Sequence, residues 1–273
     1  MHAIALFCKS YRDDVLRARR LLESVQRFNA DRLPAYVSVP AADAALFKER
    51  CAGLAFELLT DEEILAANPA LDRAAYAQLP GYQTQQVVKA EFWRLGKAEN
   101  YLCLDSDSYF LRPFGTRDFL ALDGTPYTVM HESKELLQFA ALSGMDKIAR
   151  HRAEGCAQGM ALFGREGRCW DFGPVPVVWS ARVWRDLDER YLRPRGMSFS
   201  NCSQDESGCG GATNLMFWTL AQSSRGLLTP QQQRLLLRPR ERPALMGRSA
   251  RWRPGSCPRP DQPGPGCSRS PAG

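Results

Sequence analysis

Short apolar runs alternate with amphipathic stretches along the first half of the chain. Strands are predicted at residues 3–8, 36–39 and 56–59, where apolar positions are continuous or nearly so. Helices are predicted after each of them, from Asp13 or Asp14 to about Phe28, through residues 45–51, and from residues 60–63 onward. This repeated strand-then-helix order favours an α/β fold with a mostly parallel sheet and helices on both faces.

The pattern continues with a helix at residues 83–95 and a strand at 101–104. Further strands are predicted at 127–130 and 175–179, and a further helix at 181–192. Parallel sheets of this kind bind ligands at the carboxyl ends of their strands. Polar residues that directly follow a strand are therefore the first candidates for a functional site.

The charge of +6 belongs to the end of the chain. Residues 230–273 contain nine arginines and nine of the eighteen prolines but only two acids, so they carry +7 and the other 229 residues carry −1. Aromatic side chains are sparse among these arginines, which argues against a nucleic-acid partner. We therefore expect a near-neutral globular body at residues 1–200 and an Arg/Pro/Gly/Ser-rich tail at 201–273 that is disordered or frameshifted.

Composition excludes several classes of protein. At 44% hydrophobic residues the chain is not disordered throughout, and its apolar runs are shorter than the eighteen residues of a membrane span. The start lacks the basic segment and cleavage site of a signal peptide, so we expect a cytoplasmic protein without a transmembrane segment. No CxxC pair occurs, and we expect the body cysteines to be buried thiols: Cys8, Cys51, Cys103, Cys156 and Cys169.

Asp105-Ser106-Asp107 follows the strand 101–104 and carries the most specific chemistry. Two carboxylates at i and i+2 after an extended run can converge on one hard cation, Mn²⁺ or Mg²⁺. Such a cation would stabilise a diphosphate leaving group. Asp186 and Asp188 have the same spacing but lie in a helical pattern, where we expect them to face solvent.

Two other polar groups are candidates for contacts with a nucleotide. Lys9, Ser10 and Tyr11 end the first strand, and Asp14 follows; the alternative is an ordinary strand-to-helix turn capped by Asp14. Gln85, Gln86 and Lys89 share one helix edge, which either reaches a sugar or phosphate or is merely solvated. The glycine-rich signatures of dinucleotide and P-loop sites are absent.

Two weaker pairs complete the candidates. His131 and Glu132 follow a predicted strand and are an acid/base pair or structural residues. Trp179 and Ser180 are either an acceptor-side platform for a sugar ring or part of the core.

A family resemblance rests on five blocks: residues 9–11 with Asp14, Gln85-Gln86 with Lys89, residues 101–107, residues 111–113 and residues 176–180. Together they resemble a bacterial family of glycosyltransferase-like proteins similar to GT-A nucleotide-diphospho-sugar transferases. The resemblance covers roughly residues 3–200. It implies a GT-A, Rossmann-like fold, Mn²⁺ or Mg²⁺ on Asp105 and Asp107, and a nucleotide-diphospho-sugar donor over the end of the first strand. It also suggests a cell-envelope glycan or glycolipid as the otherwise unknown acceptor.

After about residue 200 the chain departs from this resemblance. Its Arg, Pro, Gly, Ser, Cys and Trp content is what GC-rich DNA yields out of frame, so we hypothesise a frameshift there that impairs the acceptor side. Mass spectrometry of C-terminal peptides tests this hypothesis, because a detected tail peptide would refute a sequencing artefact.

Two other functions fit parts of the sequence. Residues 104–108 also resemble the DxDx[TV] motif of haloacid-dehalogenase-type phosphatases, with Asp105 as nucleophile and Asp107 as acid/base. That motif normally opens its domain, whereas about a hundred residues precede it here. The second alternative is a non-catalytic GT-A-like binding protein.

Overall fold

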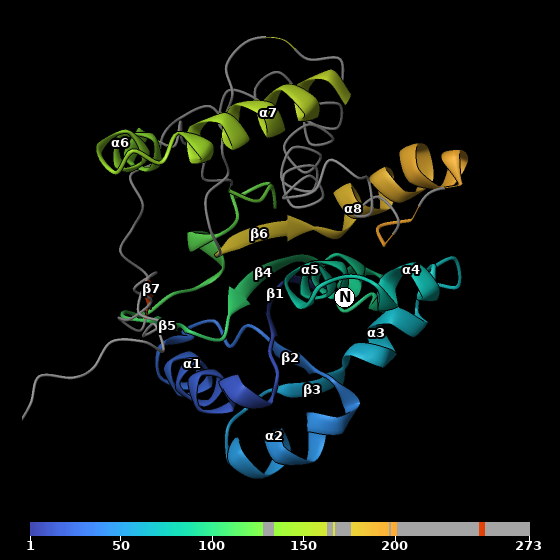
Figure 1. Ribbon diagram of the computed structural model, residues 1–273. Helices are drawn as coiled ribbons and strands as arrows, with labels where there is room; N and C mark the ends of the chain where they lie inside the picture. Colours follow the sequence, from blue (N-terminus) through green and yellow to red (C-terminus); the bar gives the residue numbers. More distant parts are fainter. Residues whose placement is uncertain (128–133, 163–165, 167–175, 197, 201–245, 249–273) are drawn as a thin grey trace, which may run out of the picture.

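The computed structural model describes residues 1–127, 134–162, 166, 176–196, 198–200 and 246–248 (Figure 1). Its centre is a five-stranded sheet in the order β3-β2-β1-β4-β6. The strands are β1 (His2–Lys9), β2 (Ala35–Val39), β3 (Glu57–Thr60), β4 (Ala98–Asp105) and β6 (Val177–Ser180). The predicted α/β fold with a mostly parallel sheet is confirmed.

Strand direction and register bring four strand ends to one edge of the sheet. β1 runs parallel to β2 and β4, and β2 runs parallel to β3. Lys9 is paired with both Ser38 and Asp105, and Val39 with Thr60. β6 alone is antiparallel to β4, with Asn100 opposite Ser180. Its carboxyl end therefore lies at the opposite edge from the other four.

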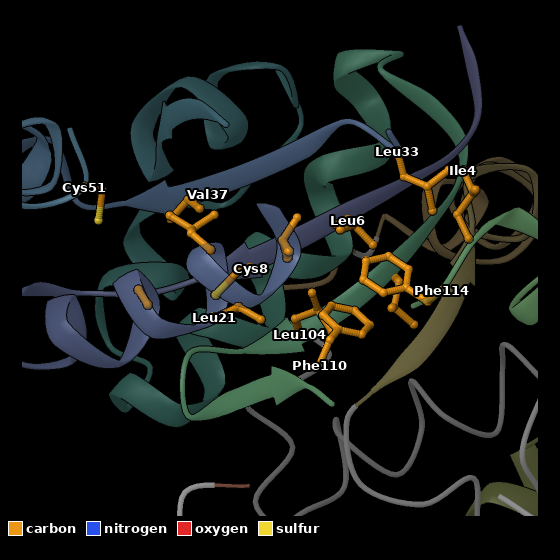
Figure 2. Packing of buried hydrophobic residues seen from close by; sticks show 14 of the residues in the cluster. Ile4, Leu6, Cys8, Leu21, Leu33, Val37, Cys51, Leu104, Phe110 and Phe114 are labelled. Atoms are coloured by element: carbon orange, nitrogen blue, oxygen red, sulfur yellow. The ribbon is translucent and has the colours of Figure 1, made fainter. Parts of the chain in front are cut away.

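Helices cover both faces of the sheet because successive strand residues point to opposite sides. On one face, Ile4, Leu6 and Cys8 of β1 pack with α1 (Val15–Phe28) and α2 (Ala44–Arg50), as Figure 2 shows for part of this cluster. On the other face, Ala5 and Phe7 pack with α3 (Asp61–Ala66), α5 (Gly81–Glu91) and α8 (Ala181–Leu187). The burial of β1 on both faces explains its continuous apolar sequence.

The remaining elements connect or flank this body. They include α4 (Arg73–Ala77), the 3₁₀ helix Phe92–Leu95, β5 (Ser108–Phe110) and the π-helix Asp188–Leu192. Two longer helices, α6 (Lys134–Leu142) and α7 (Asp146–Leu162), lie beyond β6 in Figure 1. In the tail, β7 (Met246–Arg248) pairs antiparallel with β5. The rest of residues 201–273, and residues 128–130 of the strand predicted at 127–130, lie outside the described residues.

A buried ionic cluster joins α5 and its 3₁₀ extension to the end of α8. Arg94 pairs with Glu91 and, at 2.8 Å, with Asp188. Asn68 donates to Glu91 (3.0 Å), and Arg193 pairs with Asp188 (2.6 Å). The expectation that Asp188 faces solvent was therefore wrong, because residues distant in sequence cover it; Asp188 is only 8% exposed.

The cysteine prediction holds in part. Cys8, Cys51 and Cys103 are buried free thiols, and burial raises the pKa of Cys8 to about 12. Cys156 is instead disulfide-bonded, which corrects the expectation of a thiol there. Among the described residues, no helix is long and apolar enough to span a membrane.

Candidate functional site

A cavity of about 900 Å³ opens at the edge where the parallel strands end. Residues after β1 and β4 line it, and the sheet order reverses between these two strands, which is where open α/β sheets bind ligands. Seven of the predicted site residues line this cavity: Lys9, Ser10, Tyr11, Asp14, Gln85, Asp105 and Asp107. The structure thus brings together three motifs that are up to 98 positions apart in the sequence.

Asp105 and Asp107 lie at the tight turn that connects β4 to β5. β4 ends at Asp105, residues 106 and 107 form the turn, and β5 begins at Ser108. Both carboxylates line the cavity. Within the described part of the chain, Asp105 is paired with Lys89, whereas Asp107 has no hydrogen bond or ion pair. Asp107 is therefore the carboxylate of this pair that is free to take a ligand.

Lys89 does not lie where the helix pattern predicted. Its side chain is only 1% exposed, so it is not solvated, and it does not line the cavity, so it is not placed to contact a ligand there. Its ammonium lies 2.8 Å from Oδ1 of Asp105. Burial opposes the charge, but Asp105, with smaller contributions from Cys103 and Cys8, outweighs burial, and the pKa of Lys89 is raised. Gln86 on the same helix is half-buried and also lies outside the cavity lining.

Lys9 belongs to a second ion pair in the cavity wall. Its ammonium lies 3.0 Å from Oδ2 of Asp61, and Ser38 donates a short hydrogen bond to Oδ1 of the same carboxylate. Burial raises the pKa of Asp61, although Lys9 and Ser38 both oppose that rise. Sequence reasoning missed Asp61, but a signal existed: the capping box of Thr60 and Glu63 places the start of α3 at the end of β3.

Asp14 ties the start of α1 to the turn between β4 and β5. Ser106 donates a 3.0 Å hydrogen bond to Oδ2 of Asp14, and Arg17 pairs with Oδ1 at 2.7 Å. Asp14 is the N-cap residue of α1, but its side chain makes no cap hydrogen bond, so the alternative of a turn capped by Asp14 holds for its position only. Asp14 lines the cavity as predicted, with both of its oxygens already engaged.

Ser10 carries a buried hydroxyl that has no hydrogen-bond partner within the described residues, although it lines the cavity. An unpaired buried hydroxyl costs about 1–3 kcal/mol, which a ligand in the cavity would recover. We expect Ser10→Ala to preserve or slightly raise the free energy of unfolding and, if the cavity takes the nucleotide that the sequence predicts, to weaken its binding about five- to tenfold. Thermal denaturation and calorimetric titration measure the two effects.

Ser108→Ala is the matched control, because the Ser108 hydroxyl is also buried without a partner among the described residues but lies outside the cavity lining. It should change stability similarly and leave nucleotide affinity unchanged. Equal affinities for wild type and Ser10→Ala would show that Ser10 touches no ligand.

The wall formed by α3, α4 and α5 adds residues that sequence reasoning did not single out. Its aromatic and apolar side chains are Leu65, Leu71, Tyr76 and Tyr82, and they lie beside the polar side chains of Asp61, Glu62, Arg73, Thr84 and Gln85. Burial raises the pKa of Tyr76 to about 12, so its hydroxyl remains protonated at neutral pH. With Tyr11, which is 46% exposed, this wall offers aromatic faces to a planar ligand.

The two weaker candidate pairs do not join this site. His131 and Glu132 lie outside the described residues. Trp179 is 1% exposed and packs edge-on against Tyr101 and Trp184 in the core. Because β6 is antiparallel, Ser180 lies opposite Asn100, at the edge of the sheet away from the cavity. Of the two alternatives for this pair, the core position holds for Trp179, and neither residue lies at the cavity.

The oxygen atoms of the cavity could hold a divalent cation only with further ligands from a bound substrate. Among the described residues, no group of three or more potential metal ligands is found. Asp105 and Asp107 are two hard oxygen donors on one cavity, which suits Mg²⁺ or Mn²⁺, since these ions bind one or two carboxylates and take further ligands from phosphate and water. The residues present therefore fit such a cation when it arrives with a diphosphate.

Comparison with known proteins places the chain in a family without assigning it an activity. No curated protein matches it. The model of the Family of unknown function (DUF6492) matches residues 3–205, which include the five-stranded sheet apart from His2 and every described residue of the cavity. Since this match covers about three quarters of its length, the chain belongs to DUF6492.

Proposed function

We propose that this protein is a metal-dependent glycosyltransferase that moves a sugar from a nucleotide-diphosphate donor to an acceptor. The observation that carries the proposal is the placement of Asp105 and Asp107 with Lys9, Ser10 and Tyr11 around one cavity at the switch point of the sheet. A GT-A-like use of the fold would place the nucleotide over the end of β1 and its diphosphate toward the turn after β4.

Each part of the cavity has a distinct task in this proposal. Tyr11 and the α4–α5 wall would stack on the nucleoside, and the Ser10 hydroxyl would donate to it. Asp107, with the free oxygen of Asp105, would hold the divalent cation. That cation, when bound, stabilises the negative charge that develops on the diphosphate leaving group. Lys9 and Arg17, which also line the cavity, would offset the remaining charge.

The acceptor and the setting of the reaction are part of the same proposal. A cell-envelope glycan or glycolipid, modified from the cytoplasmic side, is the acceptor class that the family resemblance suggests. An atypical segment after residue 200 would then impair acceptor binding before it affected the donor. Donor binding is for this reason the property to test first.

Calorimetric titration with UDP, GDP and their sugar conjugates tests the proposal, each with Mn²⁺ and with EDTA in its place. We expect one nucleotide series to bind with Mn²⁺ and its affinity to fall at least about tenfold with EDTA, because removal of the cation leaves the diphosphate facing two carboxylates. Absence of binding in every series would contradict the proposal.

A phosphatase assay run in parallel distinguishes the glycosyltransferase from the main alternative, a phosphatase. Release of phosphate from a phosphomonoester such as p-nitrophenyl phosphate with Mg²⁺, without nucleotide binding, would favour the haloacid-dehalogenase-type mechanism on Asp105. Metal-dependent binding without sugar transfer to any acceptor or to water would favour a non-catalytic binding protein.

A further inference from the structure

Three of the carboxylates that line the cavity already have a cation of the protein beside them. The pairs are Lys9 with Asp61 at 3.0 Å, Arg17 with Asp14 at 2.7 Å, and Lys89 with Asp105 at 2.8 Å. The free protein therefore presents much less negative charge to a metal ion than its count of acids suggests. This balance matters most at Asp105, one of the two proposed cation ligands.

Lys89 differs from the other two cations because it cannot leave its carboxylate for solvent or ligand. Its side chain is 1% exposed and lies outside the cavity lining, whereas the Asp105 side chain is 37% exposed. Arg17, by contrast, lines the cavity with a side chain that is 57% exposed. The Tyr101 hydroxyl donates to the backbone oxygen of Lys89, which fixes this part of α5 against β4.

This arrangement opposes binding of a free divalent cation. A cation on the remaining oxygen of Asp105 would share one carboxyl group with the Lys89 ammonium, and two positive charges so placed repel each other strongly where water is partly excluded. A diphosphate reverses this balance, because it brings negative charge that attracts both the cation and the ammonium.

We infer that Lys89 is a positioning residue that makes binding of the divalent cation depend on the nucleoside diphosphate. Lys89 balances Asp105 in the free protein and holds it in the geometry that the loaded site needs. The cation and the nucleotide then bind as a pair, and each raises the affinity for the other by the same factor. The inference rests on the proposed function of the same cavity.

Titration with Mn²⁺, followed by electron paramagnetic resonance of the free ion, tests this inference without any activity measurement. It compares wild type, Lys89→Met and Lys97→Met, each without nucleotide and with saturating UDP or GDP, whichever calorimetry shows to bind. Lys97 forms a 2.7 Å ion pair with Glu57 at the opposite edge of the sheet, so Lys97→Met removes the same group away from the site.

In wild type and Lys97→Met, we expect Mn²⁺ to bind at least tenfold more tightly with the nucleotide than without it. Without nucleotide, we expect Lys89→Met to bind Mn²⁺ at least tenfold more tightly than wild type, and its gain on adding nucleotide to shrink accordingly. The methionine keeps the volume of the buried stem, and circular dichroism checks that the variant folds.

Two results overturn the inference. One is wild-type affinity for Mn²⁺ that is equal with and without a bound nucleotide; this measurement needs no variant and holds even if Lys89→Met fails to fold. The other is a folded Lys89→Met that binds Mn²⁺ no more tightly than Lys97→Met. Failure of the proposed function itself looks different, because then no nucleotide binds the wild-type protein under any condition.

Discussion

Replacing Arg94 with methionine is expected to lower the free energy of unfolding by about 3–5 kcal/mol, the largest stability effect we predict. The guanidinium is 10% exposed and pairs with Glu91 and Asp188, whose side chains are 3% and 12% exposed. Its removal leaves Glu91 buried with only the Asn68 amide as a partner. Urea denaturation at neutral pH measures the loss.

The matched control is Arg190→Met on the same side of the molecule. Arg190 pairs with Asp186 at 2.6 Å, but its side chain is 74% exposed, so its loss should cost no more than about 1 kcal/mol. Equal losses in the two variants would show that the buried cluster contributes no more than a surface pair.

The cost of Arg94→Met should also depend on pH. Burial already raises the pKa of Glu91, and Arg94 opposes that rise. Without Arg94 the folded-state pKa rises further above the unfolded value, so the folded protein holds the proton over a wider range and gains stability as the pH falls. The difference in free energy of unfolding between Arg94→Met and wild type should therefore become smaller as the pH is lowered from 7 to 5.

Local patterns were sufficient to predict most elements of the sheet and the helices on it. The continuous apolar residues of β1, the apolar stripe of α1 and the capping box of Thr60 are signals within a few residues, and β1, α1 and α3 are present as predicted. The position of the site followed from the rule that ligands bind where parallel strands end. That rule requires only the order and direction of the strands.

Local patterns could not predict ion pairs between residues that are distant in sequence. Asp188 was expected to face solvent, and Lys89 either to reach a ligand or to be solvated. Their partners, Arg94 and Asp105, are 94 and 16 positions away, so neither ion pair could be read from the local pattern. For Trp179 the core alternative is right, but the sequence left it open because an apolar strand carries no mark of its direction. Assignments that depend on contacts between neighbouring residues were thus correct, whereas those that depend on contacts between residues distant in sequence were wrong or left open.

Among the site residues, Asp107→Asn should have the largest functional effect: a loss of about 100-fold or more in Mn²⁺-dependent nucleotide affinity, and of any transfer activity. The substitution removes the carboxylate charge and keeps the side-chain shape. Asp107 lies in a turn and has no hydrogen bond or ion pair within the described residues, so we expect the stability of the free protein to be unchanged.

Asp105 is a poorer position for the same test, because its removal would leave the buried Lys89 ammonium without its anion. A loss of binding in Asp105→Asn could therefore reflect local unfolding, whereas the same loss in Asp107→Asn could not. Asp186→Asn is the matched control. Asp186 also belongs to an Asp-x-Asp spacing, with Asp188, but it lies on α8 and pairs with Arg190. If Asp107→Asn bound nucleotide and Mn²⁺ as tightly as Asp186→Asn, the turn after β4 would not be a cation site, and the case for a glycosyltransferase would lose its central observation.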